Sequence, residues 1–235
     1  MTPPASTILF LHGSAETSAC WDAILSHTDA SFRAQRSNRL VSAEAVLSYA
    51  STLDEDIQVI GHSYGGVLAL ILALARPKKV QRLTLIEPVV FRLLEGRDEE
   101  ALMPVRNAHL AFADFGPNQM EHGLAALLNY WFGPGSWDRA PQKLRQLMFE
   151  DGDTIRNQME HAATYDPPID QIEALEVPTT LISGGASQAS ARSTVRVLEE
   201  LLPNARRFEI EGARHNLIHT HPARLAELIG ISKLV

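Results

Sequence analysis

The sequence predicts an α/β fold built on a mostly parallel sheet of about six strands. A short β-branched run at Val59 and Ile60 leads through residues 61–65 (Gly-His-Ser-Tyr-Gly) into an apolar stretch rich in Ala and Leu, which indicates a strand, a sharp turn and a helix. Further apolar runs near both ends of the chain have the length of buried strands. Between residues 91 and 175 the spacing is helical and strand patterns are absent, so we expect a helical insertion between two strands.

The elements before the helical insertion each follow from a local pattern. Residues 7–11 (Thr-Ile-Leu-Phe-Leu) form a continuous apolar run, which is typical of a parallel strand covered on both faces. Residues 19–26 have helical spacing, and a second helix is expected over residues 42–52, with a serine as its N-cap. Residues 31–35 give the weakest strand pattern. After the central turn and its helix, residues 80–86 form the next expected strand.

The elements after the helical insertion return to alternating strands and helices. Strands are expected over residues 178–183 and 206–210, with a helix over residues 190–202 between them. A closing helix is expected from residue 223 to residue 229, directly after a proline. With 235 residues, the chain is therefore expected to form one domain that carries one insertion.

Composition excludes several classes of partner. A formal net charge of -7 without a block of Lys and Arg argues against binding to nucleic acid. The single cysteine, Cys20, excludes an internal disulfide and favours a reducing cytoplasm. No signal peptide and no apolar run of about 20 residues is evident, so we expect no membrane partner and a cytoplasmic protein. A homodimer is left open.

The pentapeptide at residues 61–65 resembles the nucleophile elbow of the α/β-hydrolase family. The resemblance extends to residues 10–13 (Phe-Leu-His-Gly), to residues 83–88, and to residues 212–216 (Gly-Ala-Arg-His-Asn), so it brackets almost the whole chain. The family's sheet is usually longer, and no Asp-x-x-Gly-x-Gly-like loop occurs near residue 36. The resemblance implies two regions, a hydrolase core at residues 1–90 and 176–235 and a helical cap at residues 91–175.

Ser63 and His215 are the expected nucleophile and base. A serine hydroxyl is a poor nucleophile at neutral pH and needs a base within hydrogen-bond reach, for which imidazole has a suitable pKa. His215 follows the last expected strand, and it matches the family's Gly-x-x-His position. The resemblance also implies that the backbone amides of Ser14 and Tyr64 form the oxyanion hole. The other histidines give no catalytic signal, and we expect His62 to hold the turn.

The third catalytic group is expected to be Glu87. In most of the family an acid follows the strand at 178–183, but here residues 184–187 are Gly-Gly-Ala-Ser, and no carboxylate occurs between Glu176 and Glu199. Some family members instead carry the acid at the end of the strand after the nucleophile helix, which is the place of Glu87. Two alternatives stay open: Glu87 as a surface carboxylate, and the Ser187 hydroxyl as a weaker orienter of the imidazole.

The expected reaction is cofactor-free hydrolysis of a small apolar ester or related acyl compound through an acyl-enzyme. A serine nucleophile argues against dehalogenation, and neither a phosphate loop nor zinc-ligand spacing is present. Trp131, Phe132 and Phe112 in the helical insertion are expected to cover the apolar substrate. Similar triads hydrolyse lactones, thioesters and carbon–carbon bonds, and also serve perhydrolases and hydroxynitrile lyases. A ligand-binding receptor on the same scaffold is the alternative from a different class.

Overall fold

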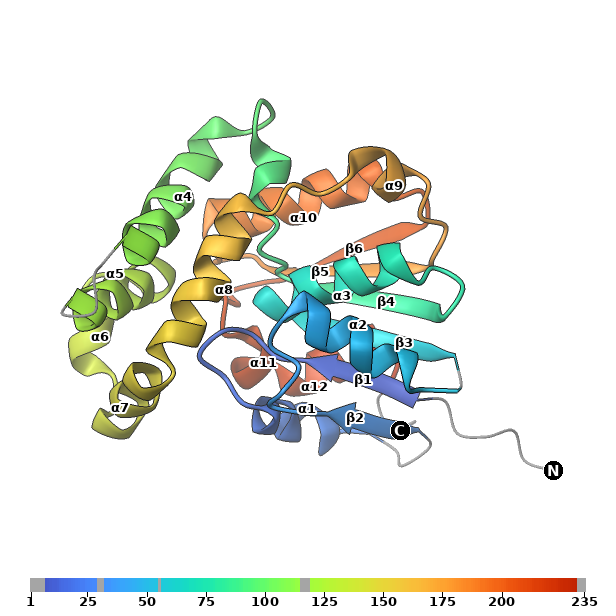
Figure 1. Ribbon diagram of the computed structural model, residues 1–235, viewed down its shortest axis with the longest axis horizontal. Helices are drawn as coiled ribbons and strands as arrows, with labels where there is room; N and C mark the ends of the chain where they lie inside the picture. The colour runs from blue at the N-terminus through green and yellow to red at the C-terminus, as the bar shows by residue number, and fades with distance from the viewer. Residues whose placement is uncertain (1–6, 29–31, 55, 115–118, 232–235) are drawn as a thin grey trace.

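A single parallel sheet forms the centre of the molecule (Figure 1). The computed structural model describes residues 7–28, 32–54, 56–114 and 119–231. Six strands in these ranges pair in parallel in the order β2-β1-β3-β4-β5-β6, which confirms the predicted fold class. The strands are β1 (Thr7–Leu11), β2 (Arg33–Arg36), β3 (Ile57–His62), β4 (Val80–Ile86), β5 (Thr179–Gly184) and β6 (Ala205–Ile210).

Helices cover both faces of the sheet, which explains the continuous apolar run of β1. Leu9 and Leu11 face a core shared with helices on one side, whereas Ile8 and Phe10 face a second core on the other side. The helices of the first side are α2 (Ala43–Ser51), α3 (Tyr64–Ala75) and α10 (Ala189–Leu201). Those of the second side are η1 (Ser18–Trp21), α1 (Asp22–Leu25), α11 (Leu217–Thr220) and α12 (Pro222–Ile229).

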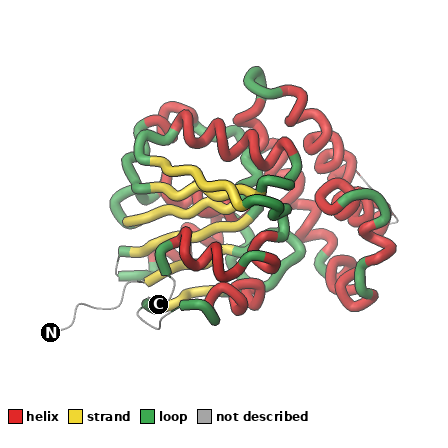
Figure 2. The backbone as a smooth tube through the Cα atoms, turned by 180° about the vertical axis from the view of Figure 1, so that it is seen from behind, coloured by secondary structure: helices red, strands yellow, loops and turns green. Residues whose placement is uncertain are grey.

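The helical insertion separates β4 from β5 in the sequence. Figures 1 and 2 show α4 to α8 gathered beyond one end of the sheet, where the strands reach their carboxyl ends. Within the insertion, α4 packs against both α5 and α8. Its helices are η2 (Phe91–Leu94), α4 (Glu99–Asp114), α5 (Met120–Phe132), α6 (Ser136–Arg139), α7 (Gln142–Glu150), α8 (Gly152–Thr164) and α9 (Ile169–Glu173).

The differences from the expected elements concern mainly the edge of the sheet and the helix ends. The edge strand β2 begins at Arg33, two residues later than expected, and residue 31 lies outside the described residues. Its four residues are largely exposed, so no apolar run marks it in the sequence. The first expected helix divides into a 3₁₀ turn and a short α-helix. Helix α11 was not predicted because it spans only four residues.

Candidate active site

The backbone at Ser63 turns sharply between β3 and α3. Ser63 has φ 54° and ψ -120°, a strained conformation for a residue with a side chain. A Cβ atom at Gly65 would lie 2.2 Å from the Leu11 carbonyl oxygen, and one at Gly61 would lie 2.2 Å from the Gly65 oxygen. Both glycines are therefore required by close approach of backbone, and the turn presents the Ser63 side chain at the carboxyl edge of the sheet.

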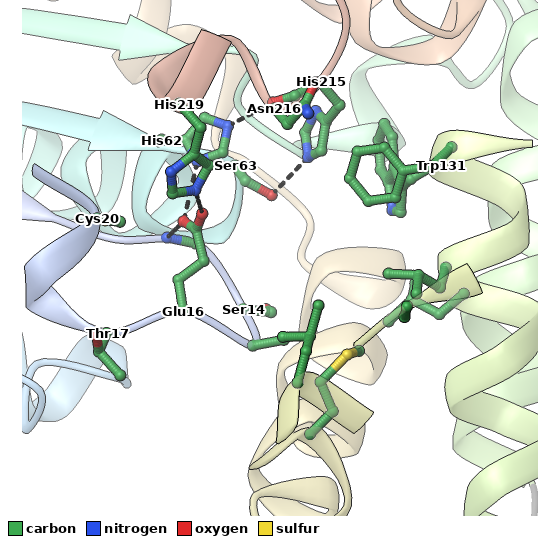
Figure 3. Close-up of a pocket in the computed structure, with 18 of the residues that line it drawn as sticks. Ser14, Glu16, Thr17, Cys20, His62, Ser63, Trp131, His215, Asn216 and His219 are labelled. Atoms are coloured by element: carbon green, nitrogen blue, oxygen red, sulfur yellow. Dashed lines mark hydrogen bonds and ion pairs between the residues drawn. The ribbon is translucent and has the colours of Figure 1, made fainter. Parts of the chain in front are cut away.

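The structure brings Ser63, His215 and Glu87 together through two hydrogen bonds, of which Figure 3 draws the one between His215 and Ser63. The imidazole Nδ1 lies 2.6 Å from Glu87 Oε2, and Nε2 lies 3.0 Å from Ser63 Oγ. Because a carboxylate only accepts, Nδ1–H is the donor to Glu87, which leaves the lone pair of Nε2 to accept from the serine hydroxyl. The Gly184 amide donates to the other Glu87 oxygen at 2.7 Å.

Burial and pairing act in opposite directions on the two titratable groups. Burial raises the pKa of Glu87, but hydrogen bonding and the charge of His215 outweigh it, so the pKa lies below its ordinary value. Burial is the largest influence on His215 and lowers its pKa, although Glu87 opposes this shift. Both directions favour an ionised carboxylate beside a neutral imidazole, which is the charge state that a general base requires.

The carboxylate reaches the imidazole from the strand next to the nucleophile. Glu87 follows β4 directly, has φ 44°, and is fully buried, so it is not a surface carboxylate. Its amide donates to the Ile182 carbonyl of β5 at 2.9 Å, which fixes the backbone at this bend. The Ser187 hydroxyl, the other expected orienter, makes no hydrogen bond to His215. The end of β5 thus supplies an amide donor, at Gly184, where most of the family has an acid shortly after the strand.

The amides of Ser14 and Tyr64, the predicted oxyanion donors, lie at the start of a loop and of a helix. Tyr64 is the first residue of α3, so its amide has no acceptor within the helix. Ser14 lies in the loop after β1 and lines the same cavity as Ser63. In the described part of the chain, no backbone carbonyl accepts a hydrogen bond from the Ser14 amide. The two amides come from two different elements, the loop after β1 and the first turn of α3.

A cavity of about 960 Å³ opens beside Ser63 and His215. Trp131 and Phe132 line it, and the Trp131 ring stacks on His215 with a centroid separation of 3.8 Å and an interplanar angle of 15°. The prediction for Phe112 needs correction, because this side chain is fully buried in the core and does not line the cavity. The apolar lining residues also include Val89, Leu127, Leu128, Leu144, Leu147, Met148 and Met159.

Three further residues of the site were missed. His109 lies on α4, lines the cavity and is fully buried, and burial lowers its pKa to about 3. Glu16 and His219 also line the cavity and are hydrogen-bonded to each other at 2.7 Å. None of the three lies in a recognisable motif, and helical spacing alone gives His109 and His219 no functional signal.

The described residues offer no metal centre and no membrane-spanning element. Within the described ranges, no group of three or more His, Cys, Asp or Glu side chains is arranged to hold a metal ion. Among the helices of the same ranges, none is both long and apolar enough to cross a membrane.

A parallel sheet that carries a linked serine, histidine and carboxylate at its carboxyl edge defines the class of this protein as an α/β protein with a hydrolase-like site. The alpha/beta hydrolase fold family matches residues 49–222. The chain belongs to this family. No sequence among curated proteins matches the chain.

Solved structures with the same fold cover nearly the whole chain. An alpha/beta hydrolase enzyme from a Medee basin deep-sea metagenome library has a TM-score of 0.76 at 17% identity, covering 100% of this chain and 93% of that one. An esterase from Rhodococcus sp. ECU1013 has a TM-score of 0.68 at 18% identity, covering 97% and 92%. An N-acyl homoserine lactone degrading enzyme has a TM-score of 0.68 at 19% identity, covering 95% and 92%. At these identities the likeness shows the fold alone.

Proposed function

We propose that the chain is a serine hydrolase that cleaves a small apolar ester or related acyl compound. Ser63 is the nucleophile, His215 the general base and Glu87 the group that orients and stabilises the imidazole. The observation that carries this proposal is the pair of hydrogen bonds, 3.0 Å and 2.6 Å long, that links the three side chains. Membership in the alpha/beta hydrolase fold family supports a hydrolase reaction.

The geometry suits transfer of an acyl group in two steps. Ser63 Oγ attacks the substrate carbonyl carbon while its proton moves to His215 Nε2, and that proton then leaves with the alcohol as the ester bond breaks. Water attacks the resulting acyl-enzyme in the same way, giving its proton to His215 and releasing the acid. The amides of Ser14 and Tyr64 bind the carbonyl oxygen as it becomes negative, and each is worth about 3 kcal/mol of the barrier by analogy with other oxyanion holes.

Trp131 and Phe132 form the apolar wall of the proposed substrate site, and the helical insertion acts as its cap. The stacked Trp131 ring also faces the imidazole that acquires a positive charge when Ser63 gives up its proton. An aromatic face attracts a cation, so this contact favours the imidazolium of the transition state. Trp131 therefore has two roles: it forms part of the cavity wall, and it stabilises the positive charge that develops on His215.

Esters of rising acyl length test the proposed substrate class. We expect kcat/KM for p-nitrophenyl esters to rise about fourfold for each added methylene from acetate to hexanoate, because each buried CH₂ contributes about 0.8 kcal/mol. The matched control is the p-nitrophenyl hemisuccinate, which places a carboxylate where the longer esters are apolar, and it should be a poor substrate. Equal rates across the series would contradict the apolar site. Failure of a fluorophosphonate to label Ser63 would favour the ligand-binding alternative.

Replacing Glu87 with Gln should lower turnover by about 10⁴-fold with the fold retained. The Gly184 amide donates to one oxygen of Glu87, so the amide oxygen of Gln is expected to take that place and turn its NH₂ group toward His215 Nδ1. The proton of the neutral ring then moves to Nε2, so this nitrogen can no longer accept a hydrogen bond from Ser63. Steady-state kinetics measure the loss. The control is Glu173→Gln, because Glu173 is an exposed carboxylate that lies outside the cavity. Activity within tenfold of the parent would contradict the assignment.

A further inference from the structure

A second carboxylate and two more histidines lie beside the triad, and their roles are not explained by the proposed reaction. Glu16 lies in the loop after β1, His62 is the last residue of β3, and His219 lies on α11 (Figure 3). Glu16 Oε2 is 3.3 Å from His62 Nδ1, and Oε1 is 2.7 Å from His219 Nε2. His62 Nε2 is 2.9 Å from the backbone carbonyl oxygen of His215. One network thus joins the loop after β1, the end of β3 and the segment from His215 to α11.

The hydrogen bonds determine the charge of the His62 ring. Its Nε2 faces a carbonyl oxygen, which only accepts, so Nε2 carries a proton. Its Nδ1 faces Glu16 Oε2, and this same oxygen already accepts from the Gly13 amide at 3.2 Å. Glu16 is ionised at neutral pH, because its hydrogen bonds hold its pKa well below the ordinary value, and an ionised carboxylate only accepts, so Nδ1 is also a donor. With protons on both nitrogens, His62 is an imidazolium paired with the Glu16 carboxylate.

The surroundings favour this charged pair despite its burial. Burial lowers the pKa of His62, but the hydrogen bond and charge of Glu16 outweigh burial, and the pKa lies above its ordinary value. Burial raises the pKa of Glu16, but hydrogen bonds from His219 and His62 outweigh it, and the pKa lies well below its ordinary value. The His62 side chain is almost fully buried, so solvent screens the pair only weakly.

We propose that Glu16 and His62 form a permanent ion pair that positions His215 and sets the pH at which His215 becomes a base. His62 fixes the loop that carries His215 by donating a hydrogen bond to the His215 carbonyl. The centroid of its cationic ring lies 5.2 Å from the centroid of the His215 ring. Both are positioning residues, because they act through His215. The proposal rests on the proposed function for its kinetic consequence, but the charge of His62 does not depend on it.

The charges around His215 fix the sign of that consequence. Glu87 and Glu16 favour its protonated form, whereas the His62 cation opposes it. His109 also faces His215 but is neutral, since burial lowers its pKa to about 3. His62 itself is faced by Glu16, His215 and Glu87. Removing the His62 charge while Glu16 remains should therefore raise the pKa of His215.

Two measurements test the ion pair. Long-range ¹⁵N–¹H NMR should show His62 protonated on both nitrogens at pH 8 in the parent protein, whereas in Glu16→Gln it should be neutral at that pH. In His62→Gln, whose amide can still donate to the His215 carbonyl, the acid limb of kcat/KM should move up by about one to two pH units. This is the size expected for one charge 5.2 Å away at an effective dielectric constant of roughly 20 to 40. His122→Gln, an exposed histidine outside the cavity, is the matched control and should leave the limb in place.

The outcomes separate this inference from the proposed function. A neutral His62 at pH 8 in the parent protein would overturn the ion pair, whatever the kinetics show. A His62→Gln enzyme that loses activity equally at every pH would show a structural role alone and would also overturn it. A doubly protonated His62 in a protein that no fluorophosphonate labels would support the ion pair and contradict the hydrolase. The NMR measurement needs no variant, so it decides even if His62→Gln fails to fold.

Discussion

Ser63→Ala should lose essentially all ester hydrolysis, a fall in kcat of about 10⁶-fold, while the fold is retained. The Ser63 backbone amide donates to the Ile86 carbonyl at 3.0 Å, and alanine preserves this bond and the turn that it stabilises. Only the hydroxyl that bonds His215 Nε2 is removed. The residual rate should come from substrate binding and from the oxyanion amides, which the substitution leaves in place.

Turnover of a p-nitrophenyl ester and fluorophosphonate labelling measure the effect of Ser63→Ala, and circular dichroism with a thermal melt checks the fold. Ser51→Ala is the matched control, because Ser51 is exposed at the end of α2 and lies outside the cavity. Hydrolysis by Ser63→Ala above the background of a mock preparation would contradict the serine hydrolase proposal.

His215→Gln should lower turnover by four to six orders of magnitude, since among the described residues no other base is hydrogen-bonded to Ser63 Oγ. The parent enzyme should show a kcat/KM that rises with pH. Below the pKa of His215 the ring is already protonated and cannot accept from Ser63; above it the neutral ring can. Burial, the largest influence, lowers this pKa, so the transition should lie below the ordinary imidazole value of about 6.5.

A pH–rate profile from pH 4 to 9 checks the position of this transition, and single-point kinetics check the variant. His221→Gln is the control: His221 bonds its neighbour Thr220 and does not line the cavity. If His221→Gln were the inactive variant and His215→Gln retained turnover, the assignment of the base would be wrong. A transition well above pH 6.5 would show that Glu87 raises the pKa of His215 by more than burial lowers it.

The sheet and its central turn could be predicted because their causes are local. Residues 61 and 65 must be glycine because backbone approaches both of them closely, and the sequence shows this spacing around Ser63 directly. Glu87 could be located because a parallel sheet gathers the carboxyl ends of its strands, and residues 184–187 offer no competing acid. The structure places its carboxylate against His215, where the sequence argument expected it.

The walls of the cavity could not be predicted because their causes are distant in sequence. Periodicity separates the buried face of a helix such as α8 from its solvent face, but it does not tell which buried residues face the cavity and which face the core. Packing among α4, α5 and α8 turns Phe112 into the core and brings Trp131 onto His215. Glu16 gives no signal either, since its partners His62 and His219 lie 46 and 203 residues away.

The placement of Glu87 directly after β4 has a consequence for the order in which the site can assemble during folding. Ser63 and Glu87 both belong to the β3-α3-β4 unit, whose contacts span short loops and close at low entropic cost. His215 is separated from Glu87 by 128 residues and joins only when β6 docks on β5. Contacts of this separation are slow to form, so the nucleophile and its carboxylate can be in place before any base is present. Recovery of fluorophosphonate reactivity during refolding would thus follow the docking of the C-terminal strand rather than the formation of the elbow.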